Sequence, residues 1–120
     1  MLKRLAAALL LTGVPCYGHA VTGRQLLNYC TEFVSKWGTG GSLDGLDTGF
    51  CIGYMQGVLD SADLSRSTGS KPSFCYPESE KVDQAIRVVE KHLRGNPGML
   101  HVSAVSQVNL ALSRAFPCKR

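Results

Sequence analysis

The sequence predicts an all-α fold, a small four-helix domain stapled by two disulfides. Apolar residues recur at helical spacing through nearly the whole chain, and no stretch alternates apolar and polar residues for long. Four cysteines follow an apolar N-terminal leader, an even number typical of a disulfide framework in an exported chain. No internal repeat or long linker divides the remainder, which indicates one domain over residues 21–120.

Residues 1–20 have the composition of a signal peptide. Two basic residues precede an uninterrupted apolar run over 5–11, and residues 18–20 offer small side chains to a signal peptidase. A membrane anchor is the alternative, but a spanning helix needs about 20 apolar residues and this run is about half that length. Lipid attachment at Cys16 is disfavoured by Pro15, where a small residue is required. We therefore expect export and removal of the leader.

Charge and cysteine spacing exclude two classes of binding protein. Two of the thirteen Lys and Arg residues lie in the leader, so eleven face nine Asp and Glu residues, an excess too small and scattered for a nucleic-acid surface. The mature chain keeps Cys30, Cys51, Cys75 and Cys118. Zinc sites usually contain a C-x₂₋₄-C pair, and no two of these cysteines are that close. We expect disulfides, with no metal and no cofactor.

The first predicted helix begins after Thr22, because Thr22 and Gln25 have the spacing of a capping box. The glycine-rich run 38–42 ends it. Its buried face carries apolar residues at helical spacing: Leu26, Leu27, Cys30, Phe33, Val34 and Trp37.

The second predicted helix runs from about residue 47 to 65, with Asp47 or Thr48 as N-cap. Gly49, Gly53 and Gly57 lie four apart on one face, although glycine in a helix interior costs about 1 kcal/mol relative to alanine. Close packing of another helix would explain them, either from this chain or from a second copy. A marginal, flexible helix is the alternative. The apolar stripe of this helix comprises Cys51, Met55, Val58 and Ala62, widened by Phe50 and Tyr54.

A polar loop over residues 66–76 separates this helix from a third, which has Pro77 in its first turn and ends at Gly95 and Pro97. A fourth helix covers about residues 102–115 and stops at Pro117. The expected buried residues are Val82, Ala85, Ile86, Val89 and Leu93 in the third helix, and Val105, Val108, Leu112 and Phe116 in the fourth.

Four cysteines allow three pairings, and an up-down-up-down bundle distinguishes between them. At a rise of about 1.5 Å per residue, Cys30 and Cys51 lie at similar heights beside the first interhelical loop. Cys75 precedes the third helix and Cys118 follows the fourth, so both belong at the opposite end. We predict the disulfides Cys30–Cys51 and Cys75–Cys118.

The mature chain lacks a recognisable catalytic set. It contains no Gly-x-Ser-x-Gly, HExxH or phosphate-loop motif. Cysteines held in disulfides leave no thiolate nucleophile. His92 is expected to be exposed near a helix end, and His101 to make a local structural contact. The sequence therefore predicts a binding protein, not an enzyme.

Motifs across residues 23–118 resemble those of the type VI secretion amidase immunity proteins of the Rap/Tai type. They are Gly23-x-x-Leu26-Leu27-x-x-Cys30, Phe50-Cys51-x-Gly53-Tyr54-x-x-Gly57, Phe74-Cys75-x-Pro77 and the terminal Phe116-Pro117-Cys118. The chain departs from this family at Ser79–Lys81, where Gly-Val-Thr is more usual, and in a longer loop over 38–46. The resemblance implies a periplasmic protein, often a homodimer, that binds a peptidoglycan-cleaving amidase toxin and blocks its cleft. A small periplasmic chaperone is the alternative from another class, and a cell-wall hydrolase is poorly supported because the catalytic set is missing.

Two polar, glycine-containing loops are candidate partner contacts, residues 38–46 and 66–74. Each lies near a predicted disulfide, and anchoring a loop reduces the ordering entropy lost on binding. We favour the second loop because Arg66, Lys71 and Phe74 combine charge with an aromatic anchor, as interface hot spots do.

Overall fold

The computed structural model describes residues 19–119. Its helices are α1 (Gly23–Lys36), α2 (Leu46–Ser67), α3 (Val82–Gly95), the short 3-10 helix η1 (Pro97–Met99) and α4 (Ala104–Ala115). Among these described residues no strand forms, and the only β-type pairing is an isolated bridge between Thr22 and Ser103. The predicted all-α fold with four helices is confirmed. The predicted signal peptide falls almost wholly on residues 1–18, outside the described residues, and stays a prediction.

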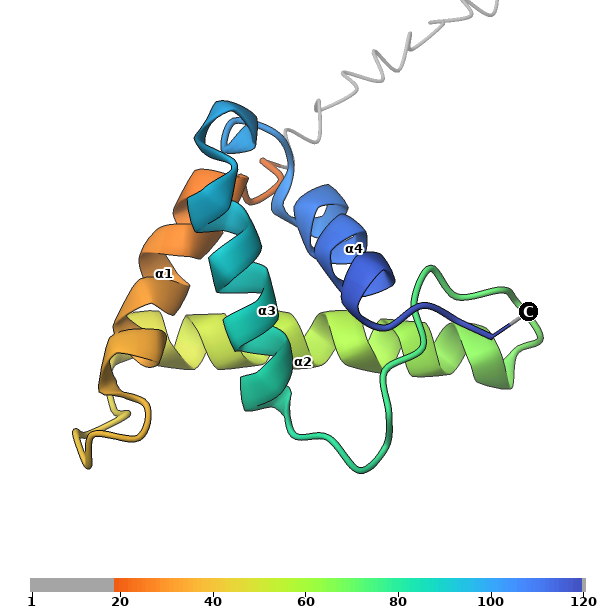
Figure 1. Ribbon diagram of the computed structural model, residues 1–120, viewed down its shortest axis with the longest axis horizontal. Helices are drawn as coiled ribbons and strands as arrows, with labels where there is room; N and C mark the ends of the chain where they lie inside the picture. Colours follow the sequence, from red (N-terminus) through yellow and green to blue (C-terminus); the bar gives the residue numbers. More distant parts are fainter. Residues whose placement is uncertain (1–18, 120) are drawn as a thin grey trace, which may run out of the picture.

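The helices do not form the expected up-down-up-down bundle. Instead α1 and α3 cross α2 at a steep angle, and α4 lies to one side of α2 (Figure 1). The fully buried residues of α2 end at Leu59, so its last two turns contribute little to the core. α1 and α3 pack on α2, while α4 packs mainly on α3 and α1.

The core lies where α1, α3 and α4 meet the N-terminal half of α2. Its largest fully buried side chains include Phe33, Phe74, Leu26, Met55, Ile86, Leu93 and Leu112. These residues confirm most of the apolar faces predicted for the first and third helices, but Trp37, expected on the buried face of the first, is 37% exposed at the C-cap of α1. The fourth helix differs, because Val105 is 46% exposed while the small side chains of Ala104 and Ala111 face the core.

The start of α1 is fixed by its own cap and by the chain that precedes α4. Thr22 and Gln25 form the predicted capping box, in which the Thr22 N–H donates to Gln25 Oε1 at 2.9 Å and the Gln25 N–H donates to Thr22 Oγ1 at 3.3 Å. The Gly23 N–H donates to the carbonyl of Val102 at 2.9 Å. Glycine fits closely at position 23, since a Cβ there would lie 3.3 Å from the carbonyl oxygen of Leu100, a tight contact.

Two helix starts differ from the predictions. α2 begins at Leu46 after Gly45, whose φ of 120° suits glycine, and neither Asp47 nor Thr48 caps it. Thr48 is instead fully buried. α3 begins at Val82, because the segment from Pro77 to Glu80 forms a turn closed by a 3.1 Å bond from the Glu80 N–H to the carbonyl of Pro77.

Both predicted disulfides are present. The Cα atoms are 5.1 Å apart in Cys30–Cys51 and 4.8 Å apart in Cys75–Cys118. The first pair is fully buried and joins α1 to α2, whereas the second is partly exposed and joins the loop before α3 to the chain after α4. That loop is held further by the Cys75 N–H, which donates to the carbonyl of Phe116 at 2.9 Å. The segment between α2 and α3 is therefore tied to the end of α4.

Candidate partner-binding groove

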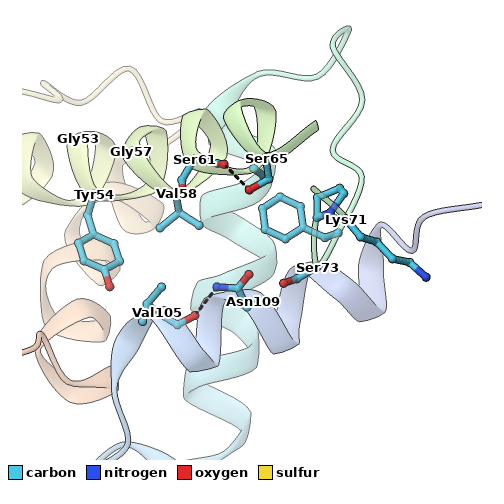
Figure 2. A pocket seen from close by; sticks show the side chains of 13 residues that line it. Gly53, Tyr54, Gly57, Val58, Ser61, Ser65, Lys71, Ser73, Val105 and Asn109 are labelled. Atoms are coloured by element: carbon cyan, nitrogen blue, oxygen red, sulfur yellow. Dashed lines mark hydrogen bonds between the residues drawn. The ribbon is translucent and has the colours of Figure 1, made fainter. Parts of the chain in front are cut away.

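An open groove of about 530 Å³ lies between α2, the loop over residues 71–74 and the first half of α4 (Figure 2). Its volume falls within the range of about 300–1,000 Å³ seen for ligand sites, and its walls are mostly small or apolar. The lining residues are Gly53, Tyr54, Gly57, Val58, Ser61, Ala62 and Ser65 from α2, Lys71, Pro72, Ser73 and Phe74 from the loop, and Val105 and Asn109 from α4.

Side chains from α2 and α4 face each other across this groove. Figure 2 shows Tyr54 and Val58 on one side and Val105 and Asn109 on the other. The Asn109 amide donates to the carbonyl of Val105 at 2.8 Å, so it is held to its own helix. Burial raises the pKa of Tyr54 above its ordinary value, so its hydroxyl stays protonated at neutral pH and can donate a hydrogen bond.

Gly53 and Gly57 form a ledge without side chains along the α2 wall, here called the glycine ledge. A Cβ added at either position would meet no atom within 4 Å, and the same holds at Gly49. The prediction that another helix of this chain packs against these glycines is therefore wrong for residues 19–119. Contact with a second copy stays a prediction. The fold itself does not need the space that the glycines leave.

Replacing Gly57 with alanine is expected to raise the free energy of unfolding by up to about 1 kcal/mol, because alanine favours the helix and its Cβ meets open space. Urea denaturation followed by circular dichroism measures the change. The matched control is Gly23→Ala, which should destabilise the protein because its Cβ would crowd Leu93 and Leu100. A Gly57→Ala variant that is less stable than the wild type would show that the ledge is already occupied or strained.

The structure separates the three residues predicted to bind a partner. Lys71 lies at one end of the groove, and its side chain extends away from it (Figure 2). Phe74 is only 1% exposed and lies beneath the groove, so the exposed aromatic anchor expected from the sequence is not found. Its ring fills core space under the loop that Cys75–Cys118 holds in place. Arg66 belongs to the last turn of α2, not to the loop, and pairs with Asp63.

Several groove residues, among them Tyr54, Val105 and Asn109, were not predicted as part of a binding site. Tyr54 was assigned only to a widened apolar face, Val105 was expected in the core and Asn109 carries no motif. The spacing of Val105 from Val108 and Leu112 is that of a buried face, and only the packed orientation of α4 shows otherwise. The groove depends on how α2 and α4 diverge, which no local pattern encodes.

Among the buried or partly buried polar residues outside the groove, His92 and Glu90 have structural partners, whereas the hydroxyl of Thr48 has none within residues 19–119. His92 is partly buried, not exposed as predicted, and its Nε2 lies 3.0 Å from Oε1 of the buried Gln107. Glu90 is buried and pairs with Arg94 one turn later. Within residues 19–119, no three His, Cys, Asp or Glu side chains come together as a possible metal site. No helix in that range is both long and apolar enough to cross a bilayer.

Fold and site together define a small helical protein with two disulfides and one preformed groove of the kind that accepts part of another molecule. The chain belongs to the Rap1a immunity protein family, whose sequence model matches residues 22–118. This confirms the resemblance at the level of an immunity protein family, which implies a protein toxin as the binding partner. No curated protein and no solved structure gives a significant match.

Proposed function

We propose that this chain is a periplasmic immunity protein that binds a peptidoglycan-cleaving amidase toxin of a type VI secretion system and blocks its active-site cleft. Membership of an immunity family supports a protein toxin as partner. The amidase and the secretion system are proposed from the motifs that end in Phe116-Pro117-Cys118. An apolar leader and two disulfides favour a location outside the cytoplasm.

The observation that carries the proposal is the preformed groove. Its α2 and α4 walls are helices, and its third wall is a loop held by Cys75–Cys118. A rigid surface loses little conformational entropy on binding, so more of the contact energy is available for affinity. The protein would therefore present an ordered surface to the toxin instead of a flexible loop.

The test is inhibition of any amidase that a neighbouring gene encodes, measured as peptidoglycan cleavage with a molar excess of mature protein. Val105→Arg places a charge in the α4 wall and is expected to weaken inhibition at least tenfold, as loss of an interface hot spot does. Leu110→Arg is the matched control, because Leu110 is 38% exposed on the same helix and does not line the groove. Undiminished cleavage with wild-type protein would reject immunity against that enzyme.

A periplasmic chaperone is the second candidate, and exposed apolar residues on α2 favour it. Leu46 is 87% exposed, Leu64 is 63% exposed and Phe50 lies between them on the same helix. The same side chains would serve a homodimer, which is part of our proposal for this family member. Suppression of client aggregation at acid pH together with no amidase inhibition would favour the chaperone.

A further inference from the structure

From the chemistry of the groove, we infer that its occupant is a short apolar segment of the toxin, about five residues long, with a carboxylate at the end nearest Lys71. This inference rests on the proposed function, because it describes the part of the partner that the groove receives. Three features of the groove carry it: its length and apolar walls, the glycine ledge, and the sign of the charge at one end.

The length and walls of the groove set the size and character of the occupant. On α2 the lining runs from Gly53 to Ser65, about 18 Å at 1.5 Å per residue. An extended chain of about five residues spans that distance. Val58 and Val105 face each other across the middle (Figure 2), so the central side chains of the occupant are apolar.

The glycine ledge allows a backbone to approach α2 closely. With no Cβ at Gly53 or Gly57, the main chain of an occupant can lie against the helix surface, as at other close helix contacts. Ser61 and Ser65 continue this row of small residues along the groove. The Ser65 hydroxyl donates to the carbonyl of Ser61 at 3.1 Å, so its oxygen can still accept from a peptide N–H, and the Ser61 hydroxyl can donate or accept. The ledge thus suits a main chain better than a bulky ring.

The charge just beyond one end of the groove is positive, because the Lys71 side chain extends outward from that end (Figure 2). Lys71 is the only ionisable Lys, Arg, Asp or Glu among the lining residues, and it makes no ion pair within residues 19–119. A second cation follows nearby, since Cys118 Sγ lies 4.0 Å from the carbonyl oxygen of Pro72 and Lys119 is the next residue. The carboxylates of Asp63 and Glu80 line a different hollow, together with Gln56 and Tyr76. A complementary occupant therefore ends in an acidic side chain.

Two blocked peptides test the inference without any toxin: acetyl-LVSVE-amide and acetyl-LVSVQ-amide, which differ only in the final side chain. We expect NMR shift changes at the amides of Val58, Val105 and Asn109, and a roughly two- to fivefold tighter binding of the Glu peptide at low salt. The difference should shrink at about 1 M salt, because screening weakens an exposed pair.

Two double variants with the same change in net charge test which lysines attract the carboxylate of the Glu peptide. Lys71→Gln with Lys119→Gln should abolish the preference for the Glu peptide, whereas Lys81→Gln with Lys91→Gln, two exposed lysines outside the groove, should keep it. Gly57→Leu should weaken both peptides while the protein stays folded, because its side chain enters the groove from open space.

Three outcomes would overturn the inference. They are equal affinity of the wild type for the two peptides, shift changes confined to other faces, and a homodimer that Gly57→Leu disrupts, which would assign the ledge to a second copy. Amidase inhibition that persists in any of these cases would leave the immunity function standing and reject only this description of the occupant.

Discussion

Replacing Cys30 and Cys51 with alanine is expected to lower the free energy of unfolding by about 3 kcal/mol or more. The chain-entropy treatment of a disulfide closing a loop of this length gives about 3 kcal/mol, and both sulfurs are fully buried, so lost packing adds to it. For a domain of this size, such a loss lowers the Tm by roughly 12–24 °C. Urea unfolding and thermal melts of the oxidised mature protein measure it, and a loss below about 1 kcal/mol would contradict it.

Replacing Cys75 and Cys118 with serine separates stability from binding. The loop that this disulfide closes is longer, so the same treatment predicts a similar or slightly larger loss, about 4 kcal/mol. Only this pair holds the loop wall of the groove. Under conditions where both variants remain folded, we expect amidase inhibition to fall when Cys75 and Cys118 are replaced with serine. It should persist when Cys30 and Cys51 are replaced with alanine. Wild-type inhibition by the serine variant would exclude the loop wall from the contact.

Replacing Phe74 with alanine is expected to cost about 3–5 kcal/mol, as for other fully buried aromatic rings, because the ring leaves a cavity under the loop. The groove should lose its base at the same time, since Phe74 also lines it. Denaturation curves give the change in stability, and shift changes with the peptide acetyl-LVSVE-amide report on the groove.

Phe74→Leu is the control, because it keeps most of the buried volume and should cost no more than about 1.5 kcal/mol. Peptide binding should then weaken strongly in Phe74→Ala, which loses much stability, and only slightly in Phe74→Leu, which loses little. If Phe74→Ala instead abolished binding while stability stayed unchanged, Phe74 would act as the direct aromatic anchor predicted from the sequence, and its burial would have to change on binding.

Local patterns sufficed for most of the fold. Thr22 and Gln25 identify the start of α1 because a capping box needs only residues three apart. The face of α3 formed by Ile86, Val89 and Leu93 follows from helical periodicity, and all three residues are buried. Helix starts were less predictable where the turn depends on distant contacts. Pro77 suits a first helical turn, but the neighbouring Cys75 is tied to Cys118, and α3 begins only at Val82.

The groove was only partly accessible to sequence reasoning. The segment preferred as a contact, residues 66–74, contributes Lys71 and Phe74 to it. Lys71 is exposed as expected, but Phe74 is buried and cannot act as an exposed aromatic anchor. A loop phenylalanine has no periodic neighbours that reveal its burial. Val105 shows the converse, because its spacing predicts burial and the orientation of α4 leaves it exposed.

By itself, the sequence determined the helical class, the order of four helices and membership of an immunity family, since each depends on residue identity and spacing along the chain. The predicted cysteine pairs are present, but they were chosen with an up-down-up-down bundle that the structure does not have. Only the tertiary structure decided that α1 and α3 cross α2, that the glycines of α2 face open space and that Val105 and Asn109 complete a groove with them. These features depend on how helices far apart in sequence are oriented. That orientation results from packing of the whole core, which no single segment encodes.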